Sequence, residues 1–337
     1  MTTTRVHDWG VRLSDRLRTA IEAGDFGHAT QLARDGDGHA RSLAREYTFM
    51  YRGLGIAIRV IMNALPDTVA PFSIESDSAA LVARFRNELG ALIEHTLEVP
   101  MPSVEAGSDL GLEIRATVEL LTAGEAAFER SQAALAEDII ASLVRHDALR
   151  SRVLVNRKER EQYLPLHDRL VRFMADAWGF VYARCGAEAL LGFHLATAEG
   201  QRAGFTKWEE MDVADFAKTS AFLLRQHMGS LDVREDEEKF TLDQSLCGSG
   251  GRLQVNGAYS GPDALPYVEE AGQLTFGQPH FPVYCSHCPV WNGVAPIRWF
   301  GRSQWVFERP AQPDGRCLLH IYKQRGAVPA EYEAKLR

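Results

Sequence analysis

The segment PVYCSHCP at residues 282–289 contains the two cysteines whose spacing is most typical of a chemical site. Cys285 and Cys288 are separated by two residues, so both thiolates can bind one metal ion from a single tight turn. Pro289 follows directly and stiffens that turn. Because two thiolates form only half of a zinc site, the pair predicts further ligands elsewhere in the chain.

Cys247 is the predicted third ligand, because the glycine-rich segment GSGG follows it at once. A flexible backbone of this kind can turn its N–H groups toward a thiolate and stabilise the negative charge. The fourth ligand stays open between Cys317, His320 and His280. Three thiolates favour zinc or an iron–sulfur cluster over magnesium or calcium, and zinc is the predicted cofactor.

Two other interpretations of these thiols are open. Buried cysteines often serve only as small apolar side chains. A cysteine pair with this spacing also occurs in redox proteins, where it opens a helix. The redox interpretation is the weakest, because Pro289 and the residues after it show no helical pattern.

A bound metal would be either structural or catalytic. Four thiolates would close the site, whereas three ligands and a water would leave a position for substrate and lower the pKa of that water. Residues 271–297 favour the catalytic use, because this stretch contains no Asp, Glu, Lys or Arg but includes Tyr284 and Trp291. Such a composition is typical of the wall of a mostly apolar pocket.

Four histidines are candidates for proton transfer. His280 and His287 lie beside or between the cysteines, and His194 and His227 lie in the apolar stripes of predicted helices. A lone histidine on an apolar face is more often a hydrogen-bonded core residue, but several from neighbouring helices could converge on one cavity. The predicted substrate-binding residues are two arginines for an acidic group and two aromatic side chains for the wall, namely Arg252, Arg298, Tyr284 and Trp291.

Composition and motifs exclude several classes of function. The net charge is −8, so there is no general electrostatic attraction to nucleic acid or anionic lipid. No nucleotide cofactor is predicted, because CGSGGR lacks the Lys-Ser or Lys-Thr of a phosphate loop. The sequence starts without the apolar segment of a signal peptide, and four prolines interrupt residues 271–297. We therefore predict a cytoplasmic protein without a membrane partner.

The elements that must position these residues are helices first and strands later. Apolar residues recur at helical spacing through residues 1–150, which predicts one domain, a bundle of four or five helices with a break near Gly124. The second domain, 151–337, is predicted to begin with three helices within 165–229, the first ending at Gly186, and to end in an antiparallel β unit at 240–325. The charged segment REDEEK before it is predicted to be a solvated connector or turn. The predicted strands are FTLDQSL, RLQV, QLTFG, FPVYC, QWVFE and CLLHIYK.

The predicted fold class is α+β and mainly α, with a cysteine-based metal site in the C-terminal β unit. The preferred function is a zinc-dependent enzyme of hydrolase or lyase type that acts on a small, carboxylate-bearing organic substrate. The first alternative is a non-catalytic protein in which zinc is structural and the helical bundle binds a partner or regulates. A redox or cluster-bearing protein is the second alternative. The apolar bundle also predicts a homodimer.

Overall fold

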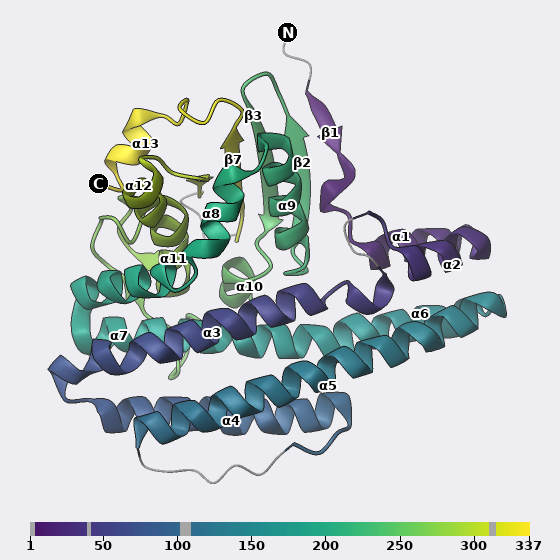
Figure 1. Ribbon diagram of the computed structural model, residues 1–337, viewed down its shortest axis with the longest axis horizontal. Helices are drawn as coiled ribbons and strands as arrows, with labels where there is room; N and C mark the ends of the chain where they lie inside the picture. Colours follow the sequence, from purple (N-terminus) through teal and green to yellow (C-terminus); the bar gives the residue numbers. More distant parts are fainter. Residues whose placement is uncertain (1–3, 39–41, 102–108, 310–314) are drawn as a thin grey trace. The chain divides into compact units, whose positions relative to one another are not determined.

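The computed structural model describes residues 4–38, 42–101, 109–309 and 315–337. The chain is mainly helical and carries a small antiparallel sheet, which confirms the predicted α+β class (Figure 1). It divides into two compact units. The cysteine unit comprises Met1–Gly10, Ala57–Glu75 and Arg172–Arg337 and holds all five cysteines. The bundle unit comprises Val11–Ile56 and Ser76–Val171.

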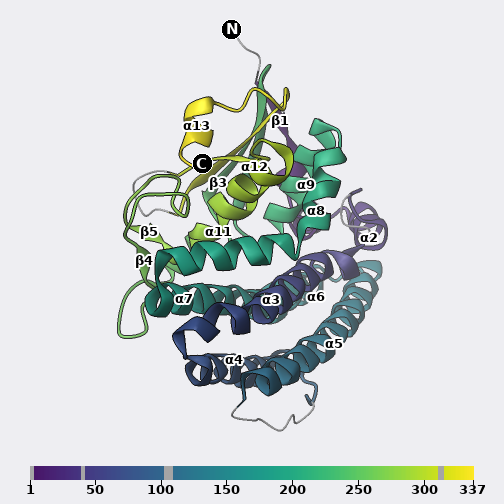
Figure 2. The ribbon, with the colours of Figure 1, turned by 60° about the vertical axis from the view of Figure 1, so that its left-hand side comes forward.

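The bundle unit is built of helices, of which α4 and α5 lie side by side in both ribbon views (Figures 1 and 2). The helix α3 continues from it into the cysteine unit, and so does α7. The bounds are α1 (Leu13–Glu22), α2 (Phe26–Asp35), a 3₁₀ turn (Leu43–Arg45), α3 (Thr48–Val69), α4 (Glu75–Leu97), α5 (Leu110–Val144), α6 (Ala148–Asn156), a π-helical segment (Arg157–Tyr163) and α7 (Leu164–Glu199).

Aspartates begin three of these helices. The side chains of Asp25, Asp109 and Asp147 each accept a hydrogen bond from the backbone N–H three residues later. Each bond satisfies one of the backbone donors that the first turn of a helix leaves without a partner. The sequence therefore fixes where α2, α5 and α6 start by capping as well as by apolar spacing.

The break predicted near Gly124 is absent, and α5 runs without interruption from Leu110 to Val144. A Cβ atom at Gly124 would lie 2.6 Å from Cδ1 of Ile93 in α4 and 3.4 Å from the hydroxyl oxygen of Tyr51 in α3. Close packing of three helices thus requires Gly124. This packing outweighs the lower helix propensity of glycine relative to alanine.

Buried charges gather around the π-helical segment of the bundle unit. Two adjacent residues of this segment, Lys158 and Glu159, are both buried. The Lys158 ammonium lies 3.3 Å from a carboxylate oxygen of Glu46, and Glu159 accepts from the Tyr47 hydroxyl and pairs with Arg18. Two cations thus balance two carboxylates, which is the condition under which buried charges are tolerated.

The cysteine unit combines short helices with a five-stranded sheet of order β1-β2-β3-β7-β6, in which every pairing is antiparallel. A two-stranded sheet pairs β4 with β5. The strands are β1 (Arg5–His7), β2 (Ser230–Glu235), β3 (Lys239–Leu246), β4 (Tyr267–Val268), β5 (Phe281–Pro282), β6 (Val306–Glu308) and β7 (Cys317–Tyr322). The helical elements are η1 (Asp8–Gly10), η3 (Ala70–Phe72), α8 (Arg202–Glu210), α9 (Val213–Arg225), α10 (Gly250–Val255), η5 (Val283–Ser286), α11 (His287–Pro289), η6 (Val290–Val294), α12 (Ala295–Phe300) and α13 (Ala330–Ala334).

The predicted helix boundary at Gly186 is confirmed. Within α7, Gly186 has φ 85° and ψ 178°, so the backbone leaves the helix there and resumes it afterwards. The helix α9 begins after Asp212, whose carboxylate accepts from the N–H of Ala214 at 2.8 Å. The helix α8 between these two was not predicted.

Two predicted strands in the β unit are absent. The segment RLQV forms helix α10 rather than a strand, because the glycines before it allow the chain to turn into a helix. The segment QLTFG forms turns, in which the N–H groups of Thr275 and Gly277 donate to the carbonyl of Gly272. The prediction of a solvated connector or turn at REDEEK is confirmed, because the segment ends β2, turns with Asp236 accepting two backbone N–H groups, and begins β3.

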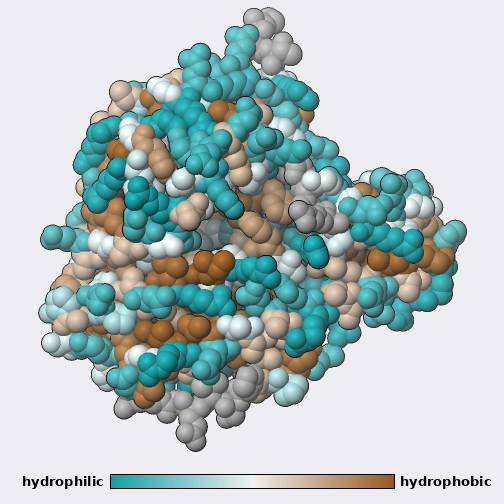
Figure 3. All heavy atoms as spheres, viewed as in Figure 1, coloured by the Kyte–Doolittle hydropathy of each residue, from teal (hydrophilic) through white to brown (hydrophobic). Residues whose placement is uncertain are grey.

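One helical stretch is long and apolar enough to pass a test for a membrane span. This stretch, Leu43–Phe72, has a window of mean hydropathy 1.2, of which 44% is buried in the protein. Core helices of soluble proteins pass the same test. On the face drawn in Figure 3, hydrophilic and hydrophobic residues are interspersed. The cytoplasmic location therefore stays a prediction.

Candidate functional site

The register of the large sheet brings two distant cysteines together. Cys317 is the first residue of β7 and pairs with Gln244 of β3, while Cys247 follows directly after β3 ends. The N–H of Cys247 donates to the carbonyl of Gly315 at 2.9 Å. The antiparallel ladder thus places residues that are 70 positions apart at one end of the sheet.

The other two cysteines lie on the helical turns that follow β5. Cys285 belongs to η5, and Cys288 belongs to α11, which continues through η6 into α12. The prediction that no helix follows Pro289 is wrong. Pro289 lies near the start of this helical run, and Pro296 lies just after the π-helical segment η6, where the regular helical hydrogen-bond pattern is already changed.

Four cysteines line one cavity. Its wall also includes four aromatic side chains, namely Phe276, Phe281, Tyr284 and Phe307. Its polar lining residues are Ser249, Gln254, His287, Arg309 and Arg316. The structure therefore brings together Cys247, Cys285, Cys288 and Cys317 with the predicted residues Tyr284 and His287. In its lining, an apolar and aromatic wall with a few polar groups, the cavity resembles sites that hold small organic molecules.

The thiols are close enough to influence one another. Burial raises the pKa of Cys285 to about 11, and it raises the pKa values of Cys288 and Cys317 in the same direction. Neighbouring thiols add to each shift, while the positive charge of Arg309 opposes it. Protonated thiols are poor nucleophiles. Across the part of the chain that the structure describes, no three His, Cys, Asp or Glu side chains are grouped so that they could hold a metal ion as they stand.

His287 is placed to exchange a proton inside this cavity. Its Nδ1 atom lies 2.6 Å from the Tyr284 carbonyl oxygen, which can only accept, so Nδ1 carries the hydrogen. Its Nε2 atom lies 3.5 Å from the Cys288 sulfur. Burial lowers the pKa of His287 to about 4, so the ring is neutral at pH 7 and Nε2 is a bare acceptor.

His194 lies behind this wall and does not line the cavity. Its Nε2 atom is 2.8 Å from the Ser286 hydroxyl, which itself donates to the Val283 carbonyl. Burial lowers the pKa of His194 well below its ordinary value, and the charge of His287 adds to this effect. The rings of His194 and His287 each lie 4.9 Å from Trp178, measured between ring centroids. His194 therefore acts as a core residue that holds the turn around Ser286.

Glycines let the backbone approach the thiols. A Cβ atom at Gly250 would lie 2.8 Å from the Cys285 sulfur, and one at Gly251 would lie 3.0 Å from Cβ of Cys247. The polar contact to the Cys247 sulfur is the Ser249 hydroxyl at 3.5 Å. The GSGG segment thus serves close packing on two cysteines at once.

Several predicted site residues lie outside this cavity. Arg252 donates to the backbone carbonyls of His227 and Met228, so that it joins α10 to the end of α9. The indole N–H of Trp291 donates to the His194 carbonyl and the Thr197 hydroxyl. His280 stacks on Tyr267 and pairs with Glu269, with 64% of its side chain exposed. Arg298 is exposed at the end of α12.

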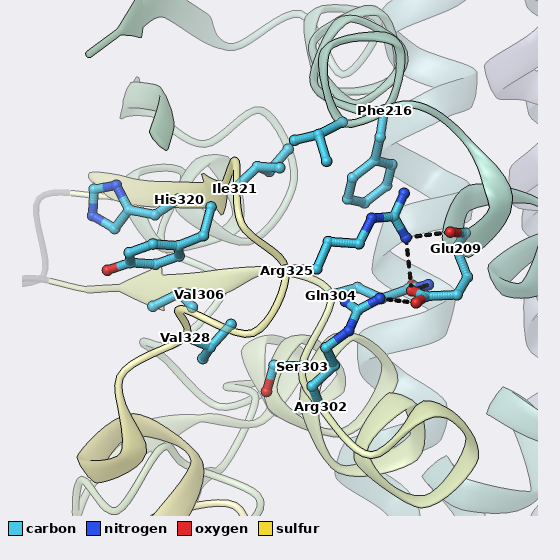
Figure 4. A pocket seen from close by; sticks show the side chains of 12 residues that line it. Glu209, Phe216, Arg302, Ser303, Gln304, Val306, His320, Ile321, Arg325 and Val328 are labelled. Atoms are coloured by element: carbon cyan, nitrogen blue, oxygen red, sulfur yellow. Dashed lines mark hydrogen bonds and ion pairs between the residues drawn. The ribbon is translucent and has the colours of Figure 1, made fainter. Parts of the chain in front are cut away.

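The structure places His320 at a second cavity (Figure 4). Its Nδ1 atom is 3.0 Å from the Thr241 hydroxyl. In that cavity Arg302 and Arg325 both pair with Glu209, and Arg325 also donates to the carbonyls of Glu209 and Met211 at the end of α8. These contacts tie α8 to the loops around the sheet.

Two functional candidates escaped prediction, Arg309 and Gln254. The Arg309 guanidinium donates to the Gln254 side-chain oxygen at 2.7 Å and lies over the ring of Phe281. Both residues line the cysteine cavity. Nothing in the local sequence distinguishes Arg309 from the chain's many surface arginines, because its environment is created by the sheet and by α10.

Comparison of the chain with protein families, with curated proteins and with solved structures finds no match.

Proposed function

We propose that this protein is a zinc-dependent enzyme of hydrolase or lyase type, with the cysteine cavity as its active site. The observation that carries the proposal is the meeting of four thiols, the neutral His287 and an aromatic wall in one cavity. The predicted substrate is a small organic molecule that bears a carboxylate. A hollow with an aromatic wall beside the thiols suits a small substrate, whereas a purely structural metal needs none.

In this proposal Cys247, Cys285 and Cys288 would hold the metal and leave the fourth position to water or substrate, whereas Cys317 as a fourth ligand would make the site structural. The bound ion would supply a Lewis acid that activates water or polarises a carbonyl-like group. His287 accepts a proton at Nε2, because its Nδ1 hydrogen is committed to the Tyr284 carbonyl. Tyr284 closes the wall beside the reacting groups. The proposal requires the thiols to draw together around the ion.

Metal content is the first test. Elemental analysis of purified protein should find about one zinc ion per chain. Replacing Cys247, Cys285 or Cys288 by serine should abolish binding, while Cys185→Ser, which changes a thiol outside the cavity, should leave it intact. Native protein without bound metal, or equal metal content in all four variants, would contradict the proposal.

A structural zinc site is the second candidate, and one observation favours it. All four cavity cysteines are available, and four thiolates would close the coordination shell. X-ray absorption at the zinc edge distinguishes a catalytic from a structural zinc site, because the catalytic site requires a nitrogen or oxygen ligand beside three sulfurs. An iron–sulfur cluster would instead give coloured protein that contains iron and no zinc.

A further inference from the structure

Arg309 is a cation in the cysteine cavity without an anionic partner in the described part of the chain. Its Nη1 atom is buried and makes no hydrogen bond. Its Nη2 atom donates to the neutral side chain of Gln254. The charge of Arg309 reaches Cys285, Cys288 and Cys317, whose pKa values it lowers against the effect of burial.

The guanidinium is held in place from two sides. The Gln254 side chain accepts from Arg309 and donates through Nε2 to the Gly250 carbonyl at 3.0 Å. The face of the guanidinium lies 4.9 Å from the ring centroid of Phe281. An arginine fixed in this way keeps its remaining N–H donors pointing in one direction, so it loses little freedom when a ligand binds.

Arg309 is half-buried, and a buried guanidinium donor with no hydrogen-bond partner or counter-charge is costly, so the cost falls when an anion enters. The arginines predicted for this role have other environments. Arg252 donates to backbone carbonyls, and Arg298 is exposed outside the cavity. Arg309 alone among these three both lines the cavity and offers a buried donor that has no partner.

We propose that Arg309 binds the carboxylate of a small organic ligand inside the cysteine cavity, with the rest of the ligand directed toward the thiols. The proposal rests on the cavity being the active site, as proposed above. It does not depend on which metal binds there. The ligand class it names is a short carboxylic acid whose reactive carbon lies within reach of the cysteine sulfurs.

Two alkylating reagents test this assignment on the purified chain after treatment with a chelator. Iodoacetate carries a carboxylate, and iodoacetamide is its neutral counterpart of nearly equal size. With either reagent a thiolate sulfur attacks the CH₂ carbon, the new S–C bond replaces the C–I bond, and iodide leaves with the bonding electrons. The thiol proton passes to the buffer. Peptide mass spectrometry measures the alkylation rate of each cysteine.

The measured quantity is the rate with iodoacetate divided by the rate with iodoacetamide. Because both reagents need the same thiolate, this ratio cancels changes in thiol pKa. We expect the ratio for the cavity cysteines to exceed that for Cys185, which lies outside the cavity. We expect it to fall about tenfold in Arg309→Gln, as is typical for loss of a charge-assisted hydrogen bond. Arg298→Gln, with the same change of net charge, should leave it unchanged.

Competition on the native sequence provides a check that needs no folded variant. Acetate should slow the alkylation of the cavity cysteines by iodoacetamide, whereas acetamide should not, and Cys185 should respond to neither. Equal ratios in the native protein and Arg309→Gln, or equal effects of acetate and acetamide, would overturn the assignment. Absence of zinc from untreated protein would instead overturn the proposed function and leave the carboxylate site standing.

Discussion

At the scale of single residues, Gly250 tests whether the cysteine cavity binds metal. A methyl group there would lie 2.8 Å from the Cys285 sulfur and 3.0 Å from Cδ1 of Tyr284, so Gly250→Ala must displace one of them. We expect bound zinc after dialysis to fall several-fold, measured by elemental analysis. Gly192→Ala in α7 is the matched control, since its methyl group meets nothing within 4 Å. Undiminished zinc in Gly250→Ala would show that Cys285 is not a ligand.

His194 should make stability depend on pH. Burial keeps its pKa well below the ordinary value of 6.5, so below pH 6.5 the unfolded chain binds a proton that the folded chain does not. The free energy of unfolding therefore falls as pH drops below 6.5, by up to about 1.4 kcal/mol per pH unit for this one proton. The contribution is fully present above pH 6.5 and decreases until the folded pKa is reached.

Urea denaturation at a series of pH values between 5 and 8 measures this slope. His194→Gln keeps a side-chain donor for Ser286 but cannot titrate. The change of unfolding free energy with pH should therefore become smaller by the amount that one bound proton contributes, up to about 1.4 kcal/mol per pH unit. His280→Gln serves as the control, because that side chain is 64% exposed. A slope that His194→Gln leaves unchanged would mean that this histidine titrates alike in both states.

The cysteines were predictable at this scale, and Arg309 was not. The two-residue spacing of Cys285 and Cys288, and the glycines after Cys247, are local features of the sequence. The lack of a partner for Arg309 arises only when β6 is paired with β7 and α10 brings Gln254 beside it. Local sequence carries no information on such an environment.

At the scale of elements, the π-helical segment Arg157–Tyr163 should depend on its buried charges. Lys158→Met removes the ammonium that faces Glu46 and leaves a buried carboxylate without its cation. We expect a loss of about 3 kcal/mol in the free energy of unfolding, measured with urea. Arg157→Met, one position earlier, breaks a pair with Glu98 whose side chains are 40% and 73% exposed, and should cost less than about 1 kcal/mol.

The double variant Glu46→Gln with Lys158→Met refines that test. Because it removes both charges of the pair, it should regain part of the stability lost by Lys158→Met alone. If the two single variants at 157 and 158 lost equal amounts, the buried pair would have no more weight than a surface one.

Helices were predicted better than strands, for reasons visible in particular segments. Gly186 and Asp212 mark boundaries by backbone conformation and capping, which are local. The segment RLQV is too short for periodicity to separate a strand from a helix, and it forms α10. The helical turns after Pro289 differ from the prediction, because the start of a helical run and a π-helical segment both tolerate proline.

At the scale of the whole molecule, the sheet joins segments that no local pattern connects. The strand β1 at Arg5–His7 pairs with β2 at Ser230–Glu235, and β3 pairs with β7 across more than seventy residues. The cysteine unit is accordingly assembled from three stretches of the chain. Spacing of apolar residues predicts elements but not which distant elements pair. The sequence therefore left Cys317, His320 and His280 open as partners of Cys247, and only the structure places Cys317 at the same cavity.

Metal removal should act most strongly on the cysteine unit, because all the proposed ligands lie in it. An ion that binds only the folded state stabilises it by an amount that grows with its concentration over its dissociation constant. We expect a chelator to increase hydrogen exchange in β3, β7 and α10, while α5 in the bundle unit changes little. Hydrogen exchange with mass spectrometry measures this, and Cys317→Ser without chelator should reproduce part of the pattern if Cys317 is the fourth ligand. An equal increase in α5 and β7 would contradict a local role of the metal, and no increase in either would mean that no metal had been bound.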